Sequence, residues 1–234
     1  MSDPWDVVHV MALKHDPAWR RLPDETRRQD AIAFLGAARA ADERVRSFTY
    51  SMVGLRSDVD LLFWRLGPSP QALEETAASL LQTGMGRFMT VAQSMVGLVR
   101  ASTYVHKPTP QEQAMFSGTR AAYLIVYPFV KTAEWYLLPR DARQGMMNDH
   151  IRIGHHYPMV KQLLAYSFGV DDQEFIVAYE TDDLRAFQDL VQALRATEGR
   201  RYTLRDTPIL VGIHRPLPEA LALLGAPVGA AVRP

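Results

Sequence analysis

The sequence predicts an α+β fold, in which two tandem ferredoxin-like halves of element order βαββαβ form a dimeric α+β barrel within one chain. Two matches between the halves support this prediction. Residues 19–23 (WRRLP) align with 135–139 (WYLLP) at an offset of 116. Residues 59–63 align with 174–178 at an offset of 115. Independent matches at nearly one offset indicate an internal duplication. Pairing the two sheets would also hide their edges.

In the first half, apolar and β-branched runs predict strands, and apolar side chains at helical spacing predict helices. One helix begins after Pro23, with Asp24 and Glu25 in its first turn, where acidic side chains favour the helix dipole. The expected elements are strands over residues 7–13, 45–53, 59–66 and 95–104, and helices from 24 to about 38 and over 71–83.

In the second half, the apolar run over residues 121–130 predicts a buried strand. Pro139 suits the first turn of a helix, in which Met146, His150 and Ile153 recur on the inward face. The repeat places further strands over 174–178 and 207–213 and a helix over 182–197.

The predicted domain boundaries follow from this repeat. The N-terminal half is expected over residues 1–105 and the C-terminal half over 121–225. Residues 106–120 are rich in Pro and polar side chains and form the expected linker. Residues 226–234 lack periodicity and are expected to be a tail.

Composition limits the possible functions. The 234 residues carry 26 Lys and Arg and 26 Asp and Glu, and this balance argues against a nucleic-acid-binding protein. The absence of cysteine excludes disulfides, thiolate metal ligands and cysteine nucleophiles, and it fits a cytoplasmic location. No apolar run approaches the roughly 20 residues of a membrane span, so we expect no membrane span and no signal peptide.

The candidate chemistry gathers in the second half, where Tyr127, Lys131, Trp135 and His150 follow one another along a strand, a turn and a helix. His150 aligns with Phe34 of the first half, a position at which packing needs only an apolar side chain. This asymmetry favours a functional imidazole, either an iron ligand or a proton-transfer group. The alternative is a core histidine with satisfied hydrogen bonds.

Other sites are disfavoured by spacing. His155 and His156 follow His150 by five and six residues, so they cannot share a metal with it on one helix, and no HExxH motif is present. The sequence also lacks GxSxG, P-loop and GxGxxG motifs. Heme is the remaining cofactor that needs a single histidine ligand. If His150 binds the iron through one ring nitrogen, Glu198 is a candidate to accept a hydrogen bond from the other. The simpler interpretation of Glu198 is an exposed carboxylate at the end of a helix.

Four segments together resemble the chlorite dismutase-like family: YPFVK at 127–131, WYLLP at 135–139, MMNDHIRIG at 146–154 and GVDDQEF at 169–175. The resemblance extends over about 123–215 and is weaker before that. It implies two ferredoxin-like halves per subunit and assembly into a homopentamer. It also implies that His150 is the proximal iron ligand, with Lys131, Trp135 and Glu198 around it.

The same family includes chlorite dismutases, which carry a distal arginine about thirteen residues after the proximal histidine, and coproheme decarboxylases. In this chain the position falls on Leu163 by counting, or on Gln162 if one residue is deleted, and neither is an arginine. One branch of the decarboxylases carries a distal glutamine and a catalytic tyrosine in a Tyr-Pro-Met-x-Lys segment. Tyr127 and Lys131 match that segment, whereas Phe129 replaces the Met.

The resemblance therefore implies a coproheme decarboxylase that uses hydrogen peroxide to convert two propionates of coproheme to vinyls. Tyr127 would relay the oxidation as a phenoxyl radical, Lys131 would hold a propionate, and Gln162 would hydrogen-bond the peroxide. Arg120 is a further candidate for binding a propionate. The alternatives are a chlorite dismutase or heme peroxidase on the same scaffold, and a non-catalytic heme-binding protein.

Overall fold

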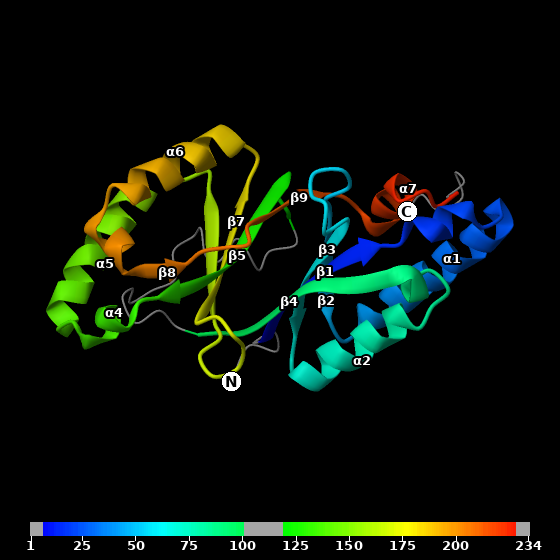
Figure 1. Cartoon of the computed structure of the whole chain (residues 1–234), viewed down its shortest axis with the longest axis horizontal. Coiled ribbons are helices and arrows are strands. Elements are labelled where there is room, and N and C mark those ends of the chain that lie inside the picture. The colour runs from blue at the N-terminus through cyan, green and yellow to red at the C-terminus, as the bar shows by residue number, and fades with distance from the viewer. Residues whose placement is uncertain (1–6, 101–118, 228–234) are drawn as a thin grey trace. The chain divides into compact units, whose positions relative to one another are not determined.

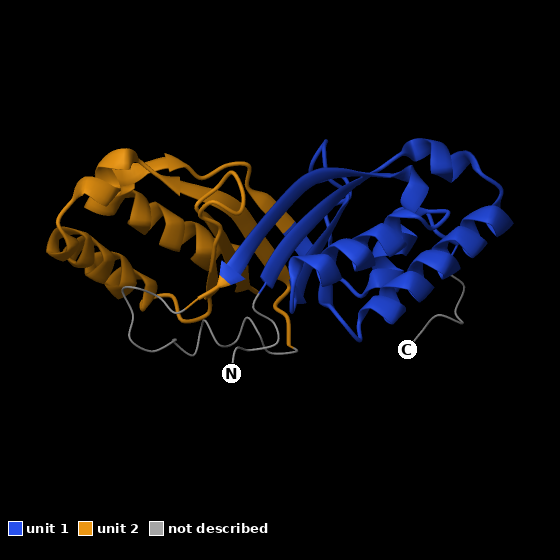
Figure 2. Cartoon of the chain, turned by 90° about the horizontal axis from the view of Figure 1, so that it is seen from below, with its two compact units in different colours: residues 1–98, 212–234 blue, residues 99–211 orange. Residues whose placement is uncertain are grey.

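The computed structural model describes residues 7–100 and 119–227, drawn as ribbons in Figure 1. The chain divides into two compact units, one of residues 1–98 with 212–234 and one of residues 99–211 (Figure 2). Most of the expected linker over 106–120 and most of the expected tail lie outside the described residues. The fold is α+β, as predicted, because each unit combines an antiparallel sheet with helices.

The N-terminal unit has the predicted order of strand, helix, two strands, helix and strand. Its strands pair antiparallel in the order β4-β1-β3-β2, which is the arrangement of a ferredoxin-like sheet. The elements are β1 (Val7–His15), α1 (Asp24–Ala41), β2 (Arg46–Ser51), β3 (Leu61–Gly67), α2 (Pro70–Leu81) and β4 (Met89–Val99), with short 3-10 helices η1 (Pro17–Arg21) and η2 (Gly86–Phe88).

Local sequence explains where these elements begin. Helix α1 starts directly after Pro23, with acidic residues in its first turn as expected. Helix α2 starts after Ser69, whose side chain accepts a hydrogen bond from the backbone nitrogen of Ala72. Strand β4 begins at Met89, six residues before the predicted start at residue 95. Phe34 of α1 is fully buried and belongs to the main apolar core of this unit.

The C-terminal unit repeats the order. Its strands pair antiparallel in the order β6-β7-β5-β8, the same ferredoxin-like arrangement. Helices α5 and α6 pack against each other and, through Ile153 and Leu190, against the sheet. The elements are β5 (Tyr123–Lys131), α4 (Ala133–Leu137), α5 (Arg140–Gly154), β6 (Lys161–Tyr166), β7 (Phe175–Thr181), α6 (Leu184–Arg195), η3 (Glu198–Tyr202) and β8 (Thr203–Arg205).

Each unit contains an equivalent hydrogen bond, and the pair fixes how the two copies correspond. The backbone nitrogen of His15, at the end of β1, donates to Asp60 Oδ2 at 3.0 Å. The backbone nitrogen of Lys131, at the end of β5, donates to Glu174 Oε2 at 2.7 Å. The equivalent of Lys131 is therefore His15, at the expected offset of 116. The offset between β3 and β7 is 114, one residue less than the sequence alignment indicated.

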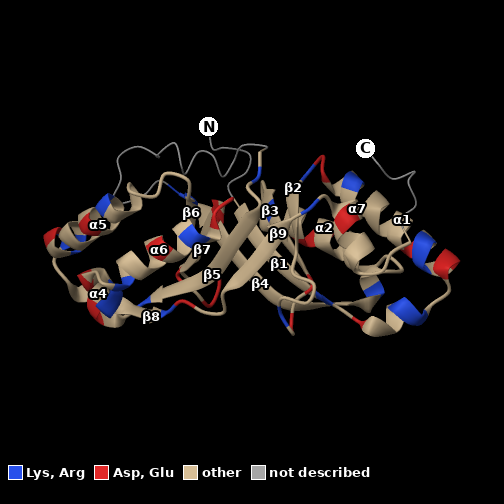
Figure 3. Cartoon of the chain, turned by 90° about the horizontal axis from the view of Figure 1, so that it is seen from above, with Lys and Arg blue, Asp and Glu red and all other residues tan. Residues whose placement is uncertain are grey.

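Two elements differ from the predicted boundaries. Strand β9 (Leu210–His214) ends beside β2, where Tyr50 pairs with His214, and α7 (Leu217–Leu223) packs on α1 and β2. Residues 212–225 therefore belong to the N-terminal unit, although the sequence placed them in the C-terminal half. Charged side chains are mostly carried by helices and loops, and the strands are largely uncharged (Figure 3). No helix in the described ranges is long and apolar enough to cross a membrane.

Candidate functional site

One face of the C-terminal sheet packs towards the helices and carries the candidate tyrosine. Tyr127 of β5 belongs to an apolar cluster that also contains Ile153 of α5 and Leu190 of α6. Successive residues of a strand point to opposite faces, so the register of the three strands decides which side chains share this face. Ile125 pairs with Tyr179 of β7, which places Tyr179 on the same face as Tyr127.

The register also separates the two candidates for the distal residue. Gln162 of β6 lies opposite Tyr179, and it therefore lies on the face that carries Tyr127. Leu163 pairs with Ala178 and points to the opposite face, where it is 3% exposed. Of the two positions that the sequence left open, only Gln162 shares a face with Tyr127.

Tyr127 is half-buried and close to a second phenol. Its ring centroid lies 6.3 Å from that of Tyr179, with the ring planes inclined by 32°. Burial raises the pKa of Tyr127 well above its ordinary value, and the charge and hydrogen bonding of Tyr179 and the nearby Asp206 raise it further. Tyr127 is therefore a neutral phenol at physiological pH.

Lys131 lies at the end of β5 among aromatic rings. Its Nζ is 4.2 Å from the centroid of Trp135 and 5.3 Å from that of Phe129, and it donates to the carbonyl of Gly199 at 3.4 Å. Burial lowers the pKa of Lys131 to about 8, partly offset by Glu174, while Arg200 lowers it further. The ammonium group is thus a poorly hydrated cation.

The turn after Lys131 is fixed by one carboxylate. Glu174 Oε2 accepts from the Lys131 backbone nitrogen and, at 2.5 Å, from the hydroxyl of Tyr136 in α4. Trp135 of the same helix is 3% exposed, and its ring lies 5.7 Å from that of Tyr202. Glu174 and the buried indole therefore hold the strand end and α4 together.

His150 lies in the third turn of α5, which begins directly after Pro139 as predicted. Burial lowers the pKa of His150 to about 4, and the nearby Lys131 ammonium lowers it further, against an opposing effect of Asp149. Lys131 is thus close enough to His150 for its charge to influence the pKa of the imidazole. Within residues 7–100 and 119–227, neither ring nitrogen of His150 has a hydrogen-bond partner. The imidazole is neutral and available as a ligand.

Helix α5 packs less tightly than the sequence implied. We expected the face with Met146, His150 and Ile153 to be buried, but all three are half-buried and no residue of α5 is fully buried. Helices α1, α2 and α6 each contain at least one fully buried residue. The apolar side chains of α5, and Tyr127 and Phe129 on the sheet face below it, thus retain partial exposure, whereas Ile125 and Tyr179 on that face are buried. His155 and His156 are exposed at the end of the helix.

Glu198 lies outside the helix in which the sequence placed it. Helix α6 ends at Arg195, and Glu198 begins the separate short helix η3, which contacts α5. The Glu198 side chain is exposed, and no hydrogen bond or ion pair joins it to another described residue, His150 included. In this structure Glu198 is near the helix of the imidazole but does not hold its ring.

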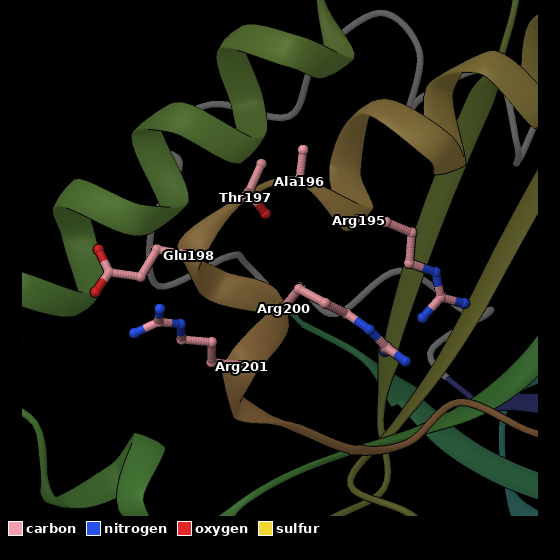
Figure 4. Close-up of a pocket in the computed structure, with 6 residues that line it drawn as sticks. All are labelled: Arg195, Ala196, Thr197, Glu198, Arg200 and Arg201. Atoms are coloured by element: carbon pink, nitrogen blue, oxygen red, sulfur yellow. The ribbon is translucent and has the colours of Figure 1, made fainter.

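A pocket of about 440 Å³ lies at the junction of α6 and η3 (Figure 4). Arg195 Nη1 and Arg200 Nη1 each contact Asp206 Oδ2, at 2.9 Å and 2.8 Å. In Figure 4 these two arginines extend to one side of η3, whereas Glu198 and Arg201 extend to the other. The lining residues are Arg195, Ala196, Thr197, Glu198, Arg200 and Arg201.

Arg120 lies apart from the other candidates. Its Nη1 is 3.6 Å from Glu180 Oε1, and both side chains are almost completely buried. Glu180 pairs with Leu124, so it points to the face opposite Tyr127. The guanidinium of Arg120 is thus engaged on the other side of the sheet from the candidate site.

Two residues of the site were missed by sequence reasoning. Tyr179 belongs to the helix-facing row, but only the register shows this, because strand β7 is apolar on both faces. Glu174 stood within the quoted GVDDQEF segment without a role. Its counterpart Asp60 in the first half is the signal that could have identified it as a cap of the strand end.

Comparison with known proteins identifies the family and the fold of the chain. The chlorite dismutase family model matches residues 27–215. A coproheme decarboxylase of Mycolicibacterium smegmatis is 34% identical over 165 residues, which is 70% of each chain. A chlorite dismutase of Candidatus Nitrospira defluvii superposes with a TM-score of 0.86 at 28% identity, covering 94% of this chain and 95% of the other.

A heme-binding protein of Thermus thermophilus has a TM-score of 0.83 at 27% identity, again covering 94% of this chain and 95% of the other. The family match covers most of the sequence and includes both units. The relative from Mycolicibacterium smegmatis exceeds 30% identity over more than two thirds of the chain. The chain therefore belongs to the chlorite dismutase family.

Proposed function

We propose that the protein binds iron coproporphyrin through His150 and catalyses the peroxide-dependent decarboxylation of two of its propionates, giving heme b. The observation that carries this proposal is the state of His150. Its imidazole is neutral, has no hydrogen-bond partner among the described residues, and lies on a helix with no fully buried side chain. A neutral, unpartnered imidazole is the ligand that heme iron takes most often.

The surroundings of His150 fit a porphyrin dianion with carboxylate arms. Lys131 supplies a cation at a poorly hydrated position, and carboxylates are its natural partners. Trp135, Phe129 and the half-buried side chains of α5 supply flat apolar surface. Lys131 would bind one propionate. The propionate would add a second negative charge to that of Glu174, which already lies near the ammonium group.

The bound iron supplies the two-electron oxidising chemistry of hydrogen peroxide. In each cycle one propionate loses carbon dioxide and a β-hydrogen and becomes a vinyl group, while peroxide is reduced to two water molecules. Tyr127 would take the hydrogen atom from the β-carbon as a phenoxyl radical, after its phenol has given an electron and a proton to the peroxide chemistry at the iron. It is the candidate because it is a phenol on the sheet face that meets the helices. Gln162 shares that face and offers an amide rather than a fixed cation.

The relatives support the same choice. The Mycolicibacterium smegmatis protein is named a coproheme decarboxylase, and it matches this chain at higher identity than the chlorite dismutase structures do. A chlorite dismutase on this scaffold would gain from a cation at the distal position, and Gln162 does not provide one. We also propose a homopentamer in the cytoplasm, for which analytical ultracentrifugation and cell fractionation are the direct tests.

The decisive experiment incubates purified apo-protein with iron coproporphyrin III and hydrogen peroxide, and follows the porphyrin masses. We expect sequential loss of two carboxyl groups, ending at heme b. His150→Ala should lose the Soret shift that reports axial ligation. Tyr127→Phe should bind coproheme with wild-type affinity and form no vinyl product.

Three results would point to another function. Oxygen release from chlorite with intact propionates would identify a chlorite dismutase, and oxidation of an added phenol under the same conditions would identify a heme peroxidase. Binding without any turnover of peroxide would identify a heme carrier. Unchanged decarboxylation by Tyr127→Phe would remove this residue from the reaction.

A further inference from the structure

The strongest unassigned feature of the C-terminal unit is the second phenol beside Tyr127. Tyr179 projects from the neighbouring strand β7, is only 4% exposed, and packs its ring 5.2 Å from that of Phe187 on α6. Its ring centroid lies 6.3 Å from that of Tyr127, with the ring planes inclined by 32°. The Tyr179 side chain is therefore held between the sheet and α6.

In the strand register, Tyr179 of β7 lies between residues of β6 and β5. Gln162 lies opposite it on β6, and Tyr127 is its diagonal neighbour on β5. Side chains opposite each other in an antiparallel pair have Cβ atoms about 5 Å apart, and diagonal neighbours are within reach of aromatic rings. A row of Gln162, Tyr179 and Tyr127 thus crosses three adjacent strands on the helix-facing side.

This pair of phenols is specific to the C-terminal unit. At the offsets fixed by Asp60 and Glu174, the counterpart of Tyr127 is Met11 and the counterpart of Tyr179 is Arg65. Packing of a ferredoxin-like unit therefore does not require either phenol. Burial raises the pKa of each hydroxyl, so both phenols are neutral at physiological pH.

We propose that Tyr179 is a redox partner of Tyr127, which accepts the radical from it by hydrogen-atom exchange and returns it when substrate is in place. The inference rests on the proposed function, which generates a phenoxyl radical at Tyr127. In the exchange the O–H bond of Tyr179 breaks and the O–H bond of Tyr127 forms. One proton and one electron move together from Tyr179 to Tyr127, so the pair keeps its charge and contains one radical throughout.

Exchange suits this site for an electrostatic reason. A phenol that loses an electron must also lose its proton, and a buried site disfavours separating the two charges. Moving a hydrogen atom between two neutral phenols separates none. Two propionates must be converted in turn, and a radical held on Tyr179 is farther from solvent than one on the half-buried Tyr127.

The link between the phenols is tested first in the apo-protein, without any porphyrin. The tyrosines are labelled with ¹³C at the ring carbon that bears the hydroxyl, and each signal is followed by NMR against pH. Loss of a signal in Tyr127→Phe assigns Tyr127. We expect the midpoint of Tyr127 to fall in Tyr179→Phe, because a neighbour that favours the neutral phenol is removed. Tyr123→Phe changes a tyrosine on the same strand and face and is the matched control. It should leave the titration midpoint of Tyr127 unchanged.

The exchange itself is tested in the coproheme-loaded protein by freeze-quenched EPR after one equivalent of peroxide. Tyrosyl radicals differ in the splitting from their methylene protons, which depends on the side-chain torsion of each residue. We expect two superposed tyrosyl signals in the wild type and in Tyr123→Phe, and a single one in Tyr179→Phe. The number of turnovers before inactivation should fall several-fold in Tyr179→Phe, with coproheme binding unchanged.

The outcomes are separable. A Tyr179→Phe spectrum identical to that of the wild type, with normal product formation, overturns the exchange and leaves the proposed function intact. A wild type that forms neither radical nor vinyl product overturns the proposed function and the exchange with it. An unchanged Tyr127 midpoint in the apo-protein overturns the coupled pair whatever the loaded protein does.

Discussion

The carboxylate of Glu174 accepts a hydrogen bond of 2.7 Å from the backbone nitrogen of Lys131. The bond joins the residue before β7 to the end of β5, at the lysine whose ammonium group lies over the ring of Trp135. Glu174 also raises the pKa of Lys131 by its charge. One side chain thus sets both the position of the strand end and the charge of the lysine.

We predict that Glu174→Ala lowers the free energy of unfolding by about 1–3 kcal/mol, because it leaves a partly buried N–H without its acceptor. It should also weaken heme binding, since the turn that carries Lys131 and Trp135 loses its anchor. Asp60→Ala removes the equivalent bond to His15 in the N-terminal unit and is the matched control. Urea unfolding and Soret titration separate the effects, and equal heme affinity of the two variants would contradict the prediction.

Gln162 and Leu163 give a second prediction, because adjacent residues point to opposite faces of β6. Leu163→Ala should cost about 2–5 kcal/mol of stability, as expected for truncation of a buried leucine, and leave heme binding intact. Gln162→Leu should cost less than about 1 kcal/mol and change the rate of reaction with peroxide. The measurements are thermal unfolding and stopped-flow absorbance. A peroxide reaction altered only in Leu163→Ala would show that the register is wrong.

His15 gives a third prediction, on acid stability. It is 2% exposed, both its ring nitrogens lack hydrogen-bond partners among the described residues, and its ring meets Trp19 edge-on at 5.1 Å. Burial, followed by the charge of Arg20, lowers the pKa of His15 to about 4, against opposing effects of Asp60 and Asp16. The folded protein thus holds this imidazole neutral.

The sign follows from proton uptake. Between pH 6.5 and about 4 the unfolded chain binds a proton at His15 and the folded chain does not. The free energy of unfolding is therefore unaffected by His15 above pH 6.5, and it decreases as the pH falls towards 4. The loss is on the order of 3 kcal/mol. His15→Leu should remove this part of the acid dependence in urea unfolding at pH 7 and pH 4.5. A variant with the wild-type difference between the two pH values would contradict the assignment.

The repeat made most of the fold predictable from the sequence. The matching WRRLP and WYLLP segments gave the correct offset for the first strand and helix of each unit, because Pro23 and Pro139 both immediately precede a helix. The second match was one residue out, since the apolar run of β7 can be aligned with that of β3 at an offset of 114 or 115. A slip of one residue reverses the faces of a strand, and this explains why the role of Tyr179 was hidden.

The candidate site was predictable where it depends on local spacing. Tyr127, Lys131, Trp135 and His150 are carried by consecutive elements, and the structure brings Lys131 together with both Trp135 and His150. Glu198 and Arg120 depended on tertiary placement. The early end of α6 moved Glu198 into η3, and the buried carboxylate of Glu180 engages Arg120.

The counterpart of His150 in the N-terminal unit is Phe34, which is fully buried in a core with Trp19 and Leu35. Among the described residues of that unit, packed apolar side chains occupy this position and no imidazole stands there. Under the proposed function, one chain therefore binds one heme at His150, although it contains the fold twice. Substitution of Phe34 would then change the stability of the N-terminal unit and leave the proposed iron ligand in place.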